Sequence, residues 1–215
     1  MYHYVEDKIF LSNMRELCGD MMQDLCHLLS TEFDISSTFY LVGSGARNLI
    51  TQNNSEPIDL DYNLEITGCY DFENCRHIKE CVRKAFNIVL RDYGFRDCDD
   101  STSSLTSKKI IFNEGNRTPF SIDICITTLD NNGNYYRLIH PKTGMSIFDQ
   151  YYWNCGPNTK NLRKKSSYIK EKGKWMLVRQ QYLDIKNRYL IQEDHNHPSF
   201  ICYIEAVNNV YNNIR

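Results

Sequence analysis

The sequence predicts an α+β fold in which a mixed or antiparallel sheet is flanked by helices and followed by a helical carboxy-terminal region. Two apolar patterns support this prediction. Segments such as Ile58–Ile66 alternate apolar and polar residues, which is typical of strands with one buried face. Segments such as Val5–Leu29 carry apolar residues three and four positions apart, which is typical of helices. A chain of 215 residues is long enough to bury one sizeable core.

The elements of the amino-terminal half follow from these patterns and from turn residues. After the first helix, Thr38–Val42 reads as a buried strand that runs into Gly43–Ile50, a tight turn opening a short helix. The alternating strand Ile58–Ile66 comes next. A second long helix is then predicted, with Asp71 as its N-cap and Gly94 at its end.

The next part of the chain reads as antiparallel strands over residues 95–127, with Asn113–Asn116 as a hairpin signal. A second turn is predicted at Asn131–Asn134, and we expect the core to end near Pro141. The sequence therefore predicts a core with its amino-terminal helix over residues 1–141. Residues 142–215 form the helical region, which is expected to pack on the core and is a candidate for binding an acceptor.

The helical region carries aromatic residues every seven positions, beside a row of cations formed by Lys172, Arg179 and Lys186. Gly173 is expected to interrupt the helix. Two interpretations stay open for residues 168–190. The cations and aromatics can bind RNA, or the aromatic face can pack on the core with a solvated basic flank. The aromatic residues are Tyr168, Trp175, Tyr182 and Tyr189.

Composition limits the classes of function. The formal net charge of −2 gives no overall case for binding nucleic acid. No apolar run approaches the ~18 residues that span a bilayer, and the amino terminus has no signal-peptide pattern. We therefore expect a cytoplasmic location and no membrane partner. The nine cysteines are an odd number without an export signal, so they are expected to be reduced thiols.

Three aspartates form the most informative feature of the sequence. Alternation in Ile58–Ile66 puts Asp59 and Asp61 on the face opposite the apolar residues, and alternation in Phe120–Thr127 does the same for Asp123. If the two strands pair, three carboxylates converge and repel one another unless cations or hydrogen bonds compensate them. Hard oxygen ligands favour Mg²⁺ or Mn²⁺. An isolated Asp-x-Asp, in contrast, usually only makes the outer face of a strand soluble.

The turn upstream of the aspartates gives them a context. Backbone N–H groups at the start of the short helix, together with the Ser44 hydroxyl, suit phosphate oxygens. Gly43 allows a positive φ or the close approach of a ligand. Arg47, one turn into the helix, is a candidate to meet a triphosphate, although a plain turn and a surface arginine are the alternatives. The segment is neither a Walker loop nor a dinucleotide-binding glycine pattern.

These features fall in a fixed order along the chain: the Gly43-Ser44 turn after a strand, the Asp59-x-Asp61 pair on the next strand, and Asp123 on a later strand. This order and spacing resemble the DNA polymerase beta-like nucleotidyltransferase superfamily, in particular its small bacterial type. The resemblance covers somewhat under half of the chain, from the strand before the turn to the Asp123 strand. All of the signature positions are filled.

The resemblance implies a nucleotidyltransferase-type fold and a set of residue roles. Gly43 and Ser44 would hold the β- and γ-phosphates of a nucleoside triphosphate, expected to be ATP. Asp59 and Asp61 would bind both of two Mg²⁺ or Mn²⁺ ions, and Asp123 would complete one metal site and help to activate the acceptor.

The implied reaction is attack of an acceptor hydroxyl on the α-phosphorus, with release of pyrophosphate. The acceptor would be a small molecule, an RNA or a protein, and the chain is too small for a DNA template to be expected. The alternative is a non-catalytic binding module of the same fold or an antitoxin-like partner protein. Loss of a signature carboxylate would favour that alternative, and all three carboxylates are present.

Overall fold

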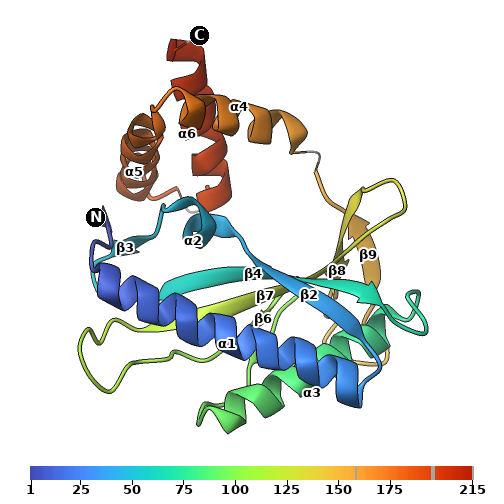
Figure 1. Cartoon of the computed structure of the whole chain (residues 1–215). Helices are drawn as coiled ribbons and strands as arrows, with labels where there is room; N and C mark the ends of the chain where they lie inside the picture. The colour runs from blue at the N-terminus through green and yellow to red at the C-terminus, as the bar shows by residue number, and fades with distance from the viewer. Residues whose placement is uncertain (158, 195–196, 215) are drawn as a thin grey trace. The chain divides into compact units, whose positions relative to one another are not determined.

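The structure is a computed structural model that describes residues 1–157, 159–194 and 197–214 (Figure 1). Its contacts divide the chain into two compact units. The sheet unit comprises Asp7–Val42 and Pro57–Gly156. The helical unit comprises Met1–Glu6, Gly43–Glu56 and Pro157–Arg215. These units are defined by contacts within the chain. The division into domains at residues 1–141 and 142–215 stays a prediction.

The sheet unit contains one seven-stranded mixed sheet within the described residues. Its hydrogen-bonded order is β2-β4-β7-β6-β5, and β8 and β9 continue from β7. β4 and β7 pair in parallel, whereas the other described pairs in this sheet are antiparallel. The predicted α+β class with a mixed sheet is therefore confirmed. The strands are β2 (Ser36–Leu41), β4 (Ile58–Gly68), β5 (Asp99–Asp100), β6 (Leu105–Thr106), β7 (Phe120–Leu129), β8 (Tyr135–Ile139) and β9 (Tyr152–Cys155).

Two long helices, α1 (Lys8–Glu32) and α3 (Cys75–Asp92), lie side by side against the sheet (Figure 1). The Asp7 side chain caps α1 by accepting a backbone N–H of the first turn. The Asn74 side chain caps α3 in the same way. The predicted N-cap at Asp71 is wrong, because this carboxylate accepts a backbone N–H two residues later, in the turn that precedes the helix.

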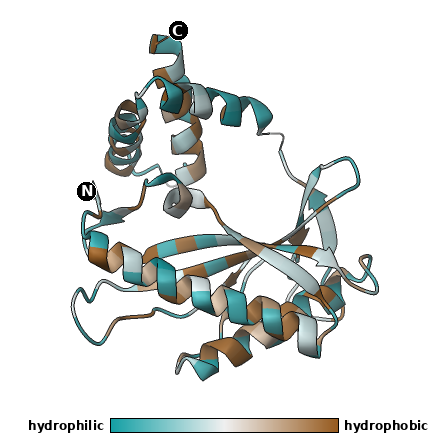
Figure 2. Ribbon diagram, in the orientation of Figure 1, coloured by the Kyte–Doolittle hydropathy of each residue, from teal (hydrophilic) through white to brown (hydrophobic). Residues whose placement is uncertain are grey.

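Burial confirms the predicted alternation along β4. In β7 the predicted apolar residues are buried, but Ser121, Cys125 and Thr127 on the opposite face are buried too, so burial does not alternate along this strand. Figure 2 shows brown and teal bands along the strands of the sheet. The apolar residues of the two strands that are buried are Ile58, Leu60, Tyr62, Leu64, Ile66, Phe120, Ile122, Ile124 and Ile126.

All nine cysteines are free thiols and five are buried, as expected for reduced core residues.

The segment between α3 and β8 differs in part from the sequence prediction. Strands β5 and β6 have only two residues each, and the expected hairpin at residues 113–116 is a loop between Ile110 and Phe120, which form an isolated antiparallel bridge. The expected turn at residues 131–134 does connect β7 to β8. The sheet continues past Pro141, because β9 pairs with β8.

The helical unit has its own apolar core and a two-stranded sheet. Gly173 adopts a φ of 66° between α4 and α5, so the expected break in the helix is confirmed. None of the described helices combines the length and the apolar composition needed to cross a membrane. The elements are β1 (Tyr2–Tyr4), α2 (Gly43–Arg47), β3 (Thr51–Asn53), α4 (Lys160–Glu171), α5 (Trp175–Ile191) and α6 (Ser199–Ile214).

The predicted basic row is engaged in contacts inside the helical unit. The Arg179 guanidinium lies 3.9 Å from the centre of the Tyr4 ring, and the Lys186 ammonium lies 3.9 Å from the centre of the Tyr2 ring. The Lys172 ammonium lies 5.5 Å from the Tyr168 ring. Arg179 also donates to a backbone carbonyl of the turn after α2. These contacts favour the packing interpretation for this row.

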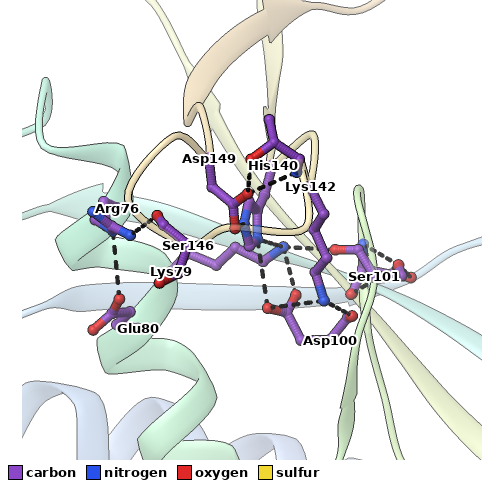
Figure 3. A network of polar contacts seen from close by, with 11 residues as sticks. Arg76, Lys79, Glu80, Asp100, Ser101, His140, Lys142, Ser146 and Asp149 are labelled. Atoms are coloured by element: carbon purple, nitrogen blue, oxygen red, sulfur yellow. Dashed lines mark hydrogen bonds and ion pairs between the residues drawn. The ribbon is translucent and has the colours of Figure 1, made fainter.

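A buried polar network ties α3, β5 and the loop after β8 together (Figure 3). The Lys79 ammonium lies 2.7 Å from the Asp100 carboxylate and donates to the Ser101 carbonyl at 2.7 Å. It also lies 3.2 Å from His140 Nδ1, while His140 Nε2 lies 3.0 Å from the Asp149 carboxylate. Burial lowers the pKa of the Lys79 ammonium, and the nearby Asp100 carboxylate opposes that shift.

The network predicts an acid-dependent stability. Hydrogen bonds from the Thr143 backbone and from His140 lower the pKa of Asp149 to about 2. The Asp149 carboxylate therefore stabilises the fold fully when the pH is above 3.8, the ordinary pKa of the group. This stabilisation is lost as the pH falls through about 2. We expect Asp149→Asn to lower the urea midpoint near neutral pH and to match the wild type near pH 2. Asp92→Asn, at the exposed end of α3, is the control. A deficit for Asp149→Asn that does not shrink in acid would contradict this account.

Candidate active site

The parallel pairing of β4 and β7 brings the three predicted carboxylates to one face of the sheet. In the register of these strands Asp61 lies directly beside Asp123, and Asp59 lies beside Ser121. Because alternate residues of a strand share a face, Asp59 lies on the same face as the pair formed by Asp61 and Asp123. Asp59 is exposed, whereas Asp61 and Asp123 are half-buried. The pairing of the two strands on which the expected convergence depends is confirmed by this register.

Two hydroxyl groups orient the carboxylates. The Ser121 hydroxyl donates to Asp59 Oδ1 at 2.5 Å. The Thr106 hydroxyl donates to Asp123 Oδ1, from strand β6, which pairs with β7 at this position. Hydrogen bonds of this kind fix the rotamer of a carboxylate, and the bond from Thr106 also favours the charged form of Asp123. The alternation of Phe120–Thr127 in the sequence also puts Ser121 on the face of Asp123, but Thr106 carries no signal in the sequence.

The surroundings of Asp123 disfavour the charged form of its carboxyl group. Burial raises the pKa of Asp123, and the negative charge of Asp59 raises it further. The hydrogen bond from Thr106 and the positive charge of Arg137 oppose this shift. A divalent cation would relieve the repulsion between the carboxylates.

Arg137 is the second residue that sequence reasoning missed. It lies opposite Thr127 in the antiparallel pair of β7 and β8, so its side chain shares the face of Asp123 and Cys125. Its guanidinium donates to Cys125 Sγ through Nη2. Its Nε is buried and has no hydrogen-bond acceptor among the described residues. An isolated arginine in a strand gives no sequence signal, because only the register reveals its neighbours.

The chemistry of the donor set fits a hard divalent cation. Carboxylate oxygens are the ligands that Mg²⁺ and Mn²⁺ prefer, and the repulsion at Asp123 is the kind that such an ion compensates. Within the described residues, however, no three or more His, Cys, Asp or Glu side chains are gathered closely enough to form a metal centre. The side chains therefore share a face without forming a complete ligand set.

Gly43, Ser44 and Arg47 belong to the helical unit. Gly43 adopts a φ of 60°, a conformation that favours glycine, as the sequence suggested for this turn. The Arg47 guanidinium donates to the Gly43 carbonyl at 2.5 Å and lies 4.5 Å from the centre of the Tyr203 ring. Arg47 thus links the turn to α6, which the sequence did not indicate.

Comparison with known proteins identifies the fold. No protein-family model matches the sequence, and no curated protein matches it. Among solved structures, CdnC of Escherichia coli MS115-1 with ATP has a TM-score of 0.60 at 17% identity, covering 97% of this chain and 62% of CdnC. The GTP-bound form of Vibrio cholerae DncV has a TM-score of 0.58 at 14% identity, covering 99% of this chain and 53% of DncV. The CdnE cyclic dinucleotide synthase of Elizabethkingia meningoseptica, with GTP and Apcpp, has a TM-score of 0.52 at 13% identity, covering 95% of this chain and 76% of CdnE.

These likenesses confirm the predicted fold. The chain therefore has the fold of CdnC, DncV and CdnE, which is the nucleotidyltransferase-type fold expected from the sequence. The chain spans about three fifths of the length of CdnC.

The repulsion at the site predicts that removing one charge stabilises the metal-free protein. The raised pKa of Asp123 means that its carboxylate destabilises the fold at neutral pH and no longer does so once acid protonates it. We expect Asp123→Asn, in the presence of a chelator, to raise the free energy of unfolding at neutral pH by up to about 1 kcal/mol. The gain should vanish as the pH falls below 3.8, the ordinary value. Urea titrations at several pH values measure it.

The control for this prediction is Asp130→Asn, in the turn between β7 and β8. Hydrogen bonds from Asn134 lower the pKa of Asp130, so this substitution should destabilise the protein at neutral pH. Equal losses of stability in the two variants would show that charge repulsion at Asp123 is not significant.

Proposed function

We propose that the protein is a nucleotidyltransferase that moves a nucleoside monophosphate from a nucleoside triphosphate, with ATP as donor, to a hydroxyl acceptor and releases pyrophosphate. The observation that carries this proposal is the register that sets Asp61 beside Asp123, with Asp59 on the same face. The likeness in fold to CdnC with ATP supports it. A purely non-catalytic module would have no need for three mutually repelling carboxylates on one face.

Asp59, Asp61 and Asp123 are the residues that we assign to two Mg²⁺ or Mn²⁺ ions. Such ions, when bound, lower the pKa of an attacking hydroxyl and neutralise charge on the leaving pyrophosphate. Ser121 holds one oxygen of Asp59, and Thr106 holds one oxygen of Asp123. The second oxygen of each carboxylate is the one that we assign to metal. The chain's own contribution is thus to fix charge and geometry in advance.

Gly43 and Ser44 are assigned to the β- and γ-phosphates. The Val42 N–H donates to the Asp61 carbonyl at 2.8 Å, and Gly43 is the next residue in the sequence. Arg47 is assigned to the same cofactor-binding region. Because its guanidinium already donates to the Gly43 carbonyl, we propose that it acts mainly by holding the turn in its bound shape.

The acceptor hydroxyl belongs to a small molecule, an RNA or a protein, and a second nucleotide is the small molecule to test first. CdnE is a cyclic dinucleotide synthase, and V. cholerae DncV is a cyclic AMP-GMP synthase. The fold is shared with both. A nucleotide acceptor would therefore use the same type of site for the same type of bond.

Calorimetric titration of ATP, GTP, CTP and UTP with and without Mg²⁺ tests the proposal without knowledge of the acceptor. We expect one nucleotide, ATP, to bind tightly only with Mg²⁺, and Asp59→Ala to reduce that affinity at least tenfold by removing a metal ligand. Asp61→Ala should abolish transfer of α-phosphate label to any acceptor while the protein stays folded. Asp92→Ala is the matched control. Failure of every nucleotide to bind, or normal transfer by Asp61→Ala, would refute the proposed enzyme.

Arg137 supplies a second prediction. A buried guanidinium nitrogen without an acceptor is costly, and a phosphate oxygen would satisfy it. We expect Arg137→Ala to weaken Mg²⁺-ATP binding by roughly tenfold or more, the loss of one charged hydrogen bond, and to leave adenosine binding unchanged. Arg137→Lys should recover only part of the loss, because lysine lacks the planar fork. Arg91→Ala, which breaks an exposed ion pair with Asp97, is the control. A uniform loss for ATP and adenosine would indicate a structural role instead.

A further inference from the structure

Positive charge is concentrated on α4 and on the turn that follows it. Between residues 160 and 174 the chain has seven lysines and arginines and a single acid, Glu171, although the whole chain has a formal net charge of −2. This segment lies within the helical unit. The concentration is therefore local and opposite in sign to the rest of the protein.

The geometry of α4 separates a basic face from a packed face. Leu162 and Ile169 pack in the core of the helical unit, and the Ser166 hydroxyl bonds to the Tyr203 hydroxyl at 2.7 Å. Arg163 and Lys164 lie on the other side of the helix and are exposed. Positions three, four and seven apart share a helical face, so residues 160, 163, 164, 167 and 170 form one stripe.

Arg163 and Lys164 of this stripe differ from Arg179 and Lys186 of the row described above. Both Arg179 and Lys186 are covered by aromatic rings and hydrogen-bonded within the helical unit. Arg163 and Lys164 have neither a ring contact nor an ion pair with any residue that the structure describes, and the same holds for Lys174. These three side chains are available to an anionic partner.

We propose that this face, defined by Arg163, Lys164, Lys170 and Lys174, binds the phosphate backbone of nucleic acid without sequence preference. A stripe from residue 160 to 170 is about 15 Å long. Phosphates follow one another every ~3.4 Å of axis along each strand of a duplex, so the stripe meets about four of them. A repeating polyanion satisfies such a row better than a single ligand does.

A membrane surface is the competing partner, and the packing of α4 argues against it. A helix that lies in a membrane interface needs an apolar face free to enter the lipid. The apolar face of α4 is already occupied by the core of the helical unit. Its exposed side is made of cations, Asn161 and Ser167. The inference goes beyond the proposed enzymatic function and does not depend on it.

Fluorescence anisotropy of a labelled DNA duplex of about 20 base pairs, two helical turns, tests the proposal without nucleotide or Mg²⁺. We expect the wild-type affinity to fall roughly a hundredfold between 50 and 200 mM salt, as four phosphate contacts require. The variant R163E/K164E/K174E should bind at least tenfold more weakly at low salt, with a slope against log salt reduced by about 2.7, the value for three lost contacts.

The matched control reverses three exposed cations of the sheet unit, Lys8, Lys84 and Arg96, to glutamate, which gives the same change in net charge. This control should bind like the wild type. Equal weakening in both triple variants would overturn the proposal in favour of a general charge effect. Absence of wild-type binding at low salt, or binding only to phosphatidylserine vesicles, would also overturn it. If the glutamate variant does not fold by circular dichroism, R163Q/K164Q/K174Q replaces it.

Discussion

The parallel pairing of β4 with β7 is the interaction on which the rest of the sheet unit depends. It joins two strands that are more than fifty residues apart in sequence, and the connection between them contains α3. Parallel neighbours need such a crossover, and the crossover helix must cover one face of the sheet. The covered face takes the apolar half of each strand. The other face is left for the carboxylates, so core and site follow from one pairing.

In that arrangement the apolar core stabilises the sheet, whereas repulsion between the aspartates of the site destabilises it. The buried isoleucines and leucines of β4 and β7 stabilise a register that forces aspartates together. Burial and like charge raise the pKa of Asp123, so the site is held together by the core behind it. Thr106 and Arg137 reduce the cost, and both come from strands that flank β7. A site of this kind needs a rigid apolar support on its far side.

Sequence patterns predicted the face of the strand on which each residue lies, but not the residues beside it on neighbouring strands. Alternation assigned Asp59, Asp61 and Asp123 to outward positions, because a period of two fixes the side of a strand on which each residue lies. It did not identify the partner strand or its direction, which depend on register. The roles of Thr106 and Arg137 were therefore invisible, as they arise only from strand pairing.

Local sequence signals were ambiguous where two residues, or two segments, were equally suited to the same role. Asp71 and Asn74 are both good N-cap residues, and the structure uses Asn74. The basic row formed by Lys172, Arg179 and Lys186 and the basic stripe of α4 look alike in sequence. They differ in the structure because aromatic residues of β1 contact Arg179 and Lys186 of the row. Packing between distant segments decides such cases.

The interleaving of the two units has a consequence for how the chain folds during synthesis. The chain passes from the helical unit to the sheet unit and back twice, because residues 1–6 and 43–56 belong with residues 157–215. Once residues 1–156 have emerged from the ribosome, every strand of the sheet unit is present, but the helices that share a unit with β1 and β3 are not. The sheet unit can therefore assemble first. The turn that carries Gly43 and Ser44 belongs to the helical unit, which cannot form until α4, α5 and α6 emerge. An incomplete chain would thus hold its three aspartates in the sheet before the turn that carries Gly43 and Ser44 has its packing partners.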